Sequence, residues 1–229
     1  MKQLIKPAII IAWKDLYLEW KTKQNITTML IFSGLVIVTF SFAFDPTNEA
    51  VRVLVPGMIW IITFFAGILG LNSSFALEKQ DDRVYSYIVA PIDPASVYIG
   101  KSLANFFFVF MTQLISIPLL FVLFDFHLIG YGKVLQFFVV LLLGTFGFIV
   151  VGTLVAALAS HTKSSQMLLP ILLFPLVTPV VIAAVQATKI ILIDKLAMTD
   201  ALSWVQLLAV YDIIFFVVGF LLFEYVLEV

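Results

Sequence analysis

The sequence predicts an all-α polytopic membrane protein with six transmembrane helices and an N-terminal interfacial amphipathic helix. Two observations predict this class: 62% of the 229 residues are hydrophobic and only 12% are charged, and six windows of about 20 residues carry almost no charge. A soluble domain is about 45–50% apolar and about 25% charged, so a water-soluble enzyme is excluded. Because 13 Lys and Arg nearly balance 14 Asp and Glu, nucleic acid is excluded as a partner.

The six charge-poor stretches are long enough to cross a hydrocarbon core about 30 Å thick as helices. Charged residues close each stretch, and the segments between them are too short for a second folded domain, so we expect one transmembrane domain over residues 1–229. Residues 189–200 contain an apolar run that is too short to cross, and we interpret them as a loop or a re-entrant piece. The expected spans are 27–44, 53–77, 103–124, 134–160, 167–188 and 202–223.

Residues 1–25 are expected to form the interfacial helix. Two Trp on an apolar face, with charges on the other face, are typical of a helix that lies in the membrane surface. The alternative is a plain extension of the first span. A signal peptide is not expected, because the apolar run is short and charges follow it at once. The apolar face carries four residues at spacings of 4, 3 and 4: Ile9, Trp13, Leu16 and Trp20.

The orientation follows from the distribution of Lys and Arg in the short loops. A cytoplasmic N-terminus puts nine basic residues inside and four outside, and an even number of spans then puts the C-terminus inside too. The inner nine are Lys2, Lys6, Lys14, Lys21, Lys23, Lys79, Arg83, Lys101 and Lys163, and the outer four are Arg52, Lys133, Lys189 and Lys195.

The connection between the second and third spans, residues 78–96, is the richest polar segment. Residues 78–88 can form a short helix with a charged start and an apolar face, which suits docking into a groove of a partner. The alternative is a solvated turn that merely joins two spans. The candidate docking residues are Glu78, Asp81, Asp82, Arg83, Tyr87 and Asp93.

The fourth span carries a stripe of small residues at one-turn spacing, which predicts close packing of another helix. These residues are Gly152, Ala156 and Ser160.

The fifth span carries three prolines, each of which removes a backbone donor and bends the helix. They predict either a broken helix that moves or lines a path, or a fixed kink. They are Pro170, Pro175 and Pro179.

Polar residues inside lipid are costly and often functional. Asp212 is the only carboxylate well inside a span; it pairs with a loop lysine or another subunit, or the span starts later. Asn72, near the inner end of the second span, and Gln113, in the third, are expected to form hydrogen bonds between helices. His127 and His161 could each ligate haem iron, but they lie in loops on opposite sides and cannot form one site.

No phosphate-binding motif is present. The nearest string, Gly130-Tyr131-Gly132-Lys133, lacks the spacing that cradles phosphates. The chain has no cysteine, which excludes disulfides and thiolate metal sites. We therefore expect no enzyme activity on this chain and no firmly bound cofactor. If the protein pumps anything, ATP and Mg²⁺ bind a separate subunit.

The chain resembles the CcmB family (haem exporter protein B), which are ABC-transporter permeases of cytochrome c maturation. Four stretches in the same order carry the resemblance. They are Lys14-Asp15-Leu16 through Glu19; Pro56-Gly57 with Trp60; Ala90-Pro91-Ile92-Asp93, then Val97 to Lys101 and Asn105; and Leu168 to Leu176 with Pro179. Some family members have an acid–base pair where this chain has Asn72-Ser73, and some have Glu where it has Gln166. The sixth span matches in hydrophobicity alone, so Asp212 inherits no role.

The resemblance implies an exporter-type ABC permease fold in the bacterial plasma membrane, in two copies that pair with two copies of a cytoplasmic CcmA-like ATPase. It also implies a CcmC-like haem-handling membrane protein and a haem chaperone, CcmE, at the outer face, with haem as the candidate cargo or with ATP driving release of the loaded chaperone. Residues 78–93 would be the coupling helix. Two alternatives stay open: an ABC exporter permease for a lipid, polysaccharide or drug, and a non-transporting scaffold of the maturation machinery.

Overall fold

A computed structural model describes residues 2–46, 48–80, 93–126, 131–160, 162 and 165–227. The described residues contain helices and no strand. The helices are α1 (Lys2–Thr22), α2 (Gln24–Ala43), α3 (Glu49–Arg52), α4 (Val55–Gln80), α6 (Pro94–Leu123), α7 (Tyr131–Ser160), α8 (Ser165–Leu192) and α9 (Leu202–Leu227). Six of them, α2, α4, α6, α7, α8 and α9, are long and apolar enough to cross a membrane. The prediction of an all-α protein with six spans and an additional N-terminal helix is confirmed.

Several helices, α6 and α8 among them, extend beyond the predicted spans because a charged residue ended the search window but not the helix. α6 begins at Pro94 instead of 103, since Lys101 lies within it and is buried. α8 continues to Leu192, so the interpretation of residues 189–192 as loop was wrong. Lys189 lies in the last turn of α8, where a cation interacts favourably with the helix dipole.

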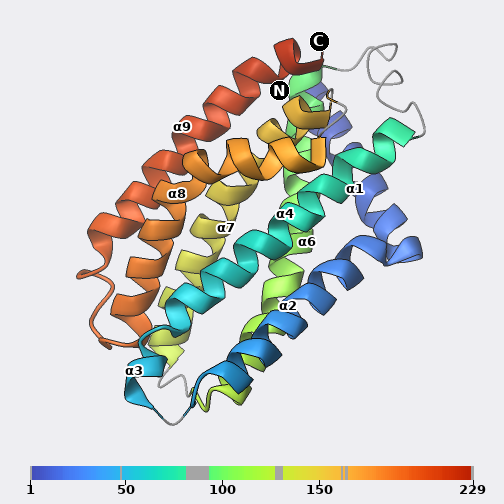
Figure 1. Cartoon of the computed structure of the whole chain (residues 1–229). Coiled ribbons are helices and arrows are strands. Elements are labelled where there is room, and N and C mark those ends of the chain that lie inside the picture. Colours follow the sequence, from blue (N-terminus) through green and yellow to red (C-terminus); the bar gives the residue numbers. More distant parts are fainter. Residues whose placement is uncertain are drawn as a thin grey trace.

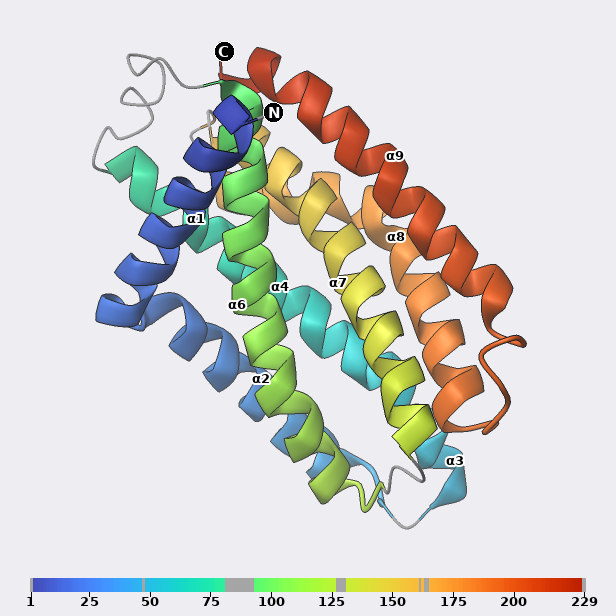
Figure 2. The ribbon, with the colours of Figure 1, turned by 180° about the vertical axis from the view of Figure 1, so that it is seen from behind.

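The helices form a bundle in which α7 is central and packs against α4, α6, α8 and α9 (Figure 1). α2 packs against α4 and α6, and α1 lies along α6. The views from the front and from behind both place the N- and C-termini at one end of the bundle and α3 at the other (Figure 2). An even number of spans requires this arrangement.

The outer surface of the bundle is apolar. Phe42 of α2, Val122 of α6 and Ile213 of α9 are 89%, 78% and 66% exposed. Apolar surface that continues around several helices is typical of the surface that lipid covers, because exposing so much apolar area to water is unfavourable. With its six candidate spans, the chain is a multi-pass membrane protein.

Small residues of α7 bring its neighbours close. A Cβ atom on Gly144 would overlap the Trp60 ring, and one on Gly152 would overlap Leu71, both of α4. Ala156 is buried one turn further on, and Ser160 is half-buried with its hydroxyl bonded to Ala157 O of the same helix at 2.6 Å.

The three prolines lie within α8, which continues through all of them. Figure 1 shows that α8 bends in its first half, which holds Pro170 and Pro175. Pro175 and Pro179 are exposed and Pro170 is half-buried, so two of the three rings face outward. Nearby, the Tyr211 hydroxyl of α9 donates to Leu176 O at 2.7 Å, which ties the bent part of α8 to α9.

Candidate coupling site where α1, α4 and α6 meet

The start of α6 is fixed by its own sequence, directly after the connection from α4. Asp93 is the N-cap: its Oδ1 accepts the backbone N–H of Ala95 at 2.9 Å. Pro94 follows at the first helical position, where a missing N–H is harmless. Asp93 thus fixes the residue at which α6 begins.

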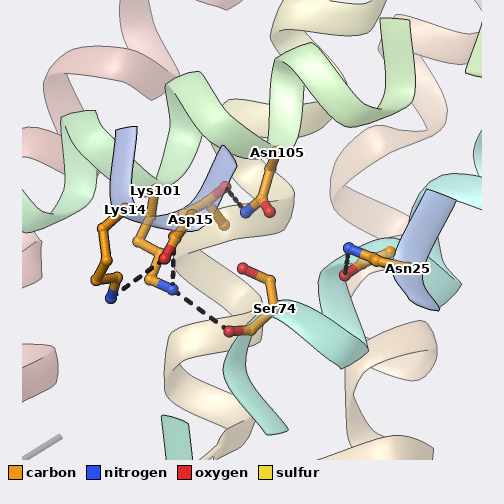
Figure 3. A network of polar contacts seen from close by, with 8 residues as sticks. Lys14, Asp15, Asn25, Ser74, Lys101 and Asn105 are labelled. Carbon is orange, nitrogen blue, oxygen red and sulfur yellow. Dashed lines mark hydrogen bonds and ion pairs between the residues drawn. The ribbon is translucent and has the colours of Figure 1, made fainter. Parts of the chain in front are cut away.

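Two turns into α6, Lys101 is 1% exposed and carries its charge into the junction of three helices. Its Nζ lies 2.9 Å from Oδ2 of Asp15 on α1 and donates to Ser74 O on α4 at 3.4 Å. Asp15 also pairs with Lys14 at 3.1 Å. Figure 3 shows the Lys101 ammonium pointing between Asp15 and Ser74. A buried cation needs such partners, because desolvation without them is very unfavourable.

Gly100 allows α1 to come close enough for this pair. A Cβ atom at Gly100 would lie 2.7 Å from Ala8 O and 2.9 Å from Ile11 Cβ, so α1 rests directly on the α6 backbone. Ala8, Ile11 and Ala12 are buried in the same contact.

The predicted orientation of α1 is corrected in one respect. Ile9, Trp13 and Trp20 are 56%, 70% and 79% exposed and face outward, whereas the acidic residues Asp15 and Glu19 face the protein. Leu16, the fourth residue of the predicted apolar face, is half-buried against the core, so apolar periodicity identified three of the four outward-facing residues correctly. It could not show that the charges find partners on α6 and α2 instead of water.

Glu19 stabilises the sharp bend at Lys23 between α1 and α2, called the elbow below. Lys23, the N-cap of α2, has φ 53° and offers no side-chain cap. The Glu19 carboxylate replaces it and accepts the backbone N–H of Ile26 at 2.8 Å. Burial raises the pKa of Glu19, and hydrogen bonds from the backbones of Ile26 and Asn25 partly oppose that rise. Asn25 Nδ2 donates to Gly70 O at 3.4 Å, which joins the elbow to α4.

Deeper in the bundle, polar side chains join helices α4, α6 and α7. Gln113 Nε2 donates to Thr63 Oγ1 at 3.1 Å, and Thr145 Oγ1 donates to Gln113 Oε1 at 2.9 Å. Asn105 Nδ2 donates to Thr153 Oγ1 at 3.3 Å. The expected helix-to-helix hydrogen bonding of Gln113 is confirmed.

The other predicted site residues fall into three groups. Glu78 lies in the last turn of α4. Six other candidates lie outside the described residues: Asp81, Asp82, Arg83, Tyr87, His127 and His161. Asn72 is half-buried on α4, near Ser74. Asp212 lies on α9 against Gly147 of α7, away from the junction of α1, α4 and α6.

Sequence reasoning missed the Asp15–Lys101 pair. Both residues stood in the stretches that carry the family resemblance, which was the available signal. Nothing in the spacing placed them together, because α1 and α6 are far apart in the chain.

The chain is similar to known proteins over most of its length. A family model described as CcmB protein matches residues 7–225. Relatives named "Heme exporter protein B" include one from Rhodobacter capsulatus, 30% identical over 77% of this chain and 79% of its own length. Another, from Pseudomonas aeruginosa, is 26% identical over 74% of each chain. A third, from Paracoccus denitrificans, is 25% identical over 77% of this chain and 79% of its own. The predicted resemblance is confirmed, and the chain belongs to the CcmB family.

Proposed function

We propose that this chain is the membrane permease subunit of an ABC transporter that exports haem, or releases the haem chaperone, during c-type cytochrome biogenesis. The observation that carries the proposal is the CcmB family match over nearly the whole chain. The relatives named heme exporter protein B and the six candidate spans support it. The sequence lacks a phosphate-binding loop, so ATP and Mg²⁺ belong to a cytoplasmic CcmA-like subunit.

Residues 78–96 are the proposed docking segment for that ATPase. α4 ends at Gln80 and α6 begins at Pro94, so a displacement of the intervening residues acts on both helices at once. The contacts of Lys101 with Asp15 and Ser74 support movement of α1 together with α4 and α6. Closure of the ATPase would thereby tilt these three helices as one rigid body. Nucleotide binding would in this way move the membrane-spanning parts of the helices.

The orientation follows from this role. The end of the bundle that carries both termini and the α4–α6 connection faces the cytoplasm, and α3 faces outward in the bacterial plasma membrane. The excess of Lys and Arg at the first end supports this orientation. Two copies of the chain would assemble with two ATPase subunits, and a CcmC-like protein and a haem chaperone would act at the outer face.

Complementation of a strain that lacks the gene tests the proposal. Glu78→Ala and Arg83→Ala should reduce c-type cytochromes, measured by haem staining, and should weaken co-purification of the ATPase at unchanged membrane abundance. Arg52→Ala is the matched control: Arg52 is the last residue of α3 at the opposite end, its side chain is 40% exposed, and it forms an ion pair with Asp125 at 3.6 Å.

Three outcomes would contradict the proposal. Normal cytochromes and ATPase recovery in both variants would remove the docking role of residues 78–96. A deletion strain with intact c-type cytochromes but an envelope or drug-resistance defect would point to another cargo. Normal cytochromes after single replacement of Pro170, Pro175 and Pro179 by Ala would favour a scaffold with fixed kinks.

A further inference from the structure

Asp212 is a carboxylate in the middle of a membrane-spanning helix. It lies ten residues after the start of α9 at Leu202, or about 15 Å along the helix axis, which is roughly half the thickness of the hydrocarbon core. Asp212 is only 4% exposed. Within the part of the chain that the structure describes, neither carboxylate oxygen has a hydrogen-bond partner. An unpaired anion at this depth is unfavourable, so a function that needs it is expected.

Asp212 lines a groove between α7 and α9 with a volume of about 360 Å³, which lies within the range of about 300–1,000 Å³ typical of small-molecule sites. Ile213 and Val217 on its rim are 66% and 48% exposed, so the groove opens toward lipid. Its other walls are apolar: Leu143, Phe146, Ala209 and Phe216.

Gly147 makes room for the carboxylate at the base of this groove. A Cβ atom on Gly147 would overlap Oδ1 of Asp212 and would lie 3.3 Å from Cγ2 of Val180. The carboxylate is therefore held against the backbone of α7, where a bulkier residue would displace it. The position of the charge is built by two helices and does not depend on one flexible side chain.

The walls and the charge together select one class of ligand. Phe146 and Phe216 face each other with ring centroids 6.0 Å apart, and both line the groove with Asp212. A cation gains from the carboxylate and from the aromatic faces, and its apolar substituents suit the aliphatic walls. Small metal ions need several oxygen ligands, which this lining does not supply, and anions are repelled.

We propose that the α7–α9 groove binds a lipophilic organic cation that enters from the membrane, with Asp212 as its counter-charge. This site is separate from the coupling region at the junction of α1, α4 and α6, and it does not depend on the function proposed above. Bulky ammonium or phosphonium compounds are the chemical class it fits.

Equilibrium binding of radiolabelled tetraphenylphosphonium to the purified full chain in lipid nanodiscs tests the proposal. Tetraphenylborate has the same shape and the opposite charge, so it reports partition into lipid. We expect saturable binding of the cation alone. Asp212→Asn should weaken this binding by about tenfold or more, because the charge partner is lost. Asp194→Asn, which removes the same charge from an exposed position in the α8–α9 connection, should leave it unchanged.

Phe216→Leu provides a second variant that keeps the groove apolar and removes one aromatic face. It should weaken cation binding several-fold with a small change in thermal unfolding, because Phe216 also contacts Tyr98 and Phe146. Thermal unfolding of Asp212→Asn, measured beside it, separates loss of binding from a folding defect. Equal cation binding by wild type and Asp212→Asn, or no saturable binding by wild type, would overturn the proposal. So would loss of a co-purifying membrane protein from Asp212→Asn in place of any ligand effect, since a basic side chain of a partner helix would then occupy the groove.

Discussion

The ammonium of Lys101 on α6 lies 2.9 Å from the carboxylate of Asp15 on α1, and this buried pair joins the N-terminal helix to the membrane bundle. Lys101 is 1% exposed, and its ammonium also donates to the carbonyl of Ser74 on α4 (Figure 3). α1 is therefore fixed to the end of the bundle that carries the proposed docking segment.

Lys101→Met should destabilise the protein by about 3–5 kcal/mol, because the Asp15 carboxylate, 10% exposed, loses its buried cation and keeps the more exposed Lys14 as an ion-pair partner. Thermal unfolding of the purified protein in detergent measures the effect. The double variant Asp15→Leu with Lys101→Met should recover much of the loss, since an apolar pair of similar volume needs no charge compensation.

Lys14→Ala is the control for this pair. Lys14 contacts the same carboxylate at 3.1 Å, but its side chain is 36% exposed, so its loss should change stability by less than about 1 kcal/mol. Equal losses of stability in Lys14→Ala and Lys101→Met would show that the burial of Lys101 does not strengthen its ion pair with Asp15.

Gly100→Leu should release α1 from α6, because the first added carbon already overlaps Ala8 O and Ile11. The chain has no cysteine, so a single thiol introduced at the buried position Ala12 reports the separation cleanly. Maleimide should label this thiol slowly in the parent and much faster in the Gly100→Leu variant.

Gly34→Leu is the matched control, since nothing lies within 4 Å of a Cβ atom there. It should leave the labelling rate of the Ala12 thiol unchanged. If Gly100→Leu labelled as slowly as the parent, the close approach of α1 to α6 would not determine its position.

The sequence was sufficient for the spans and insufficient for the contacts between them. Charge-poor windows located all six, because only long apolar helices are stable in lipid, whatever packs beside them. The same rule misplaced the start of α6, since Lys101 is charged yet buried. The pairing of Lys101 with Asp15 and the capping of α2 by Glu19 depend on how α1 folds back, and no local pattern encodes that geometry.

Gln113→Leu should reduce stability by about 1 kcal/mol, the typical scale of polar contacts between membrane helices. Gln113 of α6 forms hydrogen bonds with Thr63 of α4 and Thr145 of α7, so the substitution removes both hydrogen bonds between these helices. Thr112→Val is the control, because the Thr112 hydroxyl donates to Phe108 O of its own helix at 3.0 Å and, among the described residues, to no other helix. Thermal unfolding of both variants should rank them clearly, and equal losses would refute the bridging role.

Glu19 should make stability depend on pH in a defined direction. Burial raises the pKa of Glu19 above its ordinary 4.5, so the folded state binds this proton more tightly than the unfolded state. The free energy of unfolding therefore falls as pH rises from 4.5 through the raised pKa. Glu19→Gln keeps an acceptor for Ile26 N and cannot titrate, so the variant should gain stability relative to wild type across that window. Below it the two should coincide, and a constant difference at all pH values would contradict the shift.

The proposed orientation of the bundle can be tested by labelling single introduced cysteines, because the chain has no native cysteine. Asn48 is the N-cap of α3, and Tyr225, 66% exposed, lies in the last turn of α9. Figure 2 shows α3 and the C-terminus at opposite ends of the molecule. A membrane-impermeant maleimide should label Asn48→Cys in intact spheroplasts and Tyr225→Cys only after permeabilisation, because both termini and the α4–α6 connection are proposed to face the cytoplasm. The reverse pattern would place residues 78–96 outside, where no ATPase could reach them, and the coupling role would fail while the helical architecture stood.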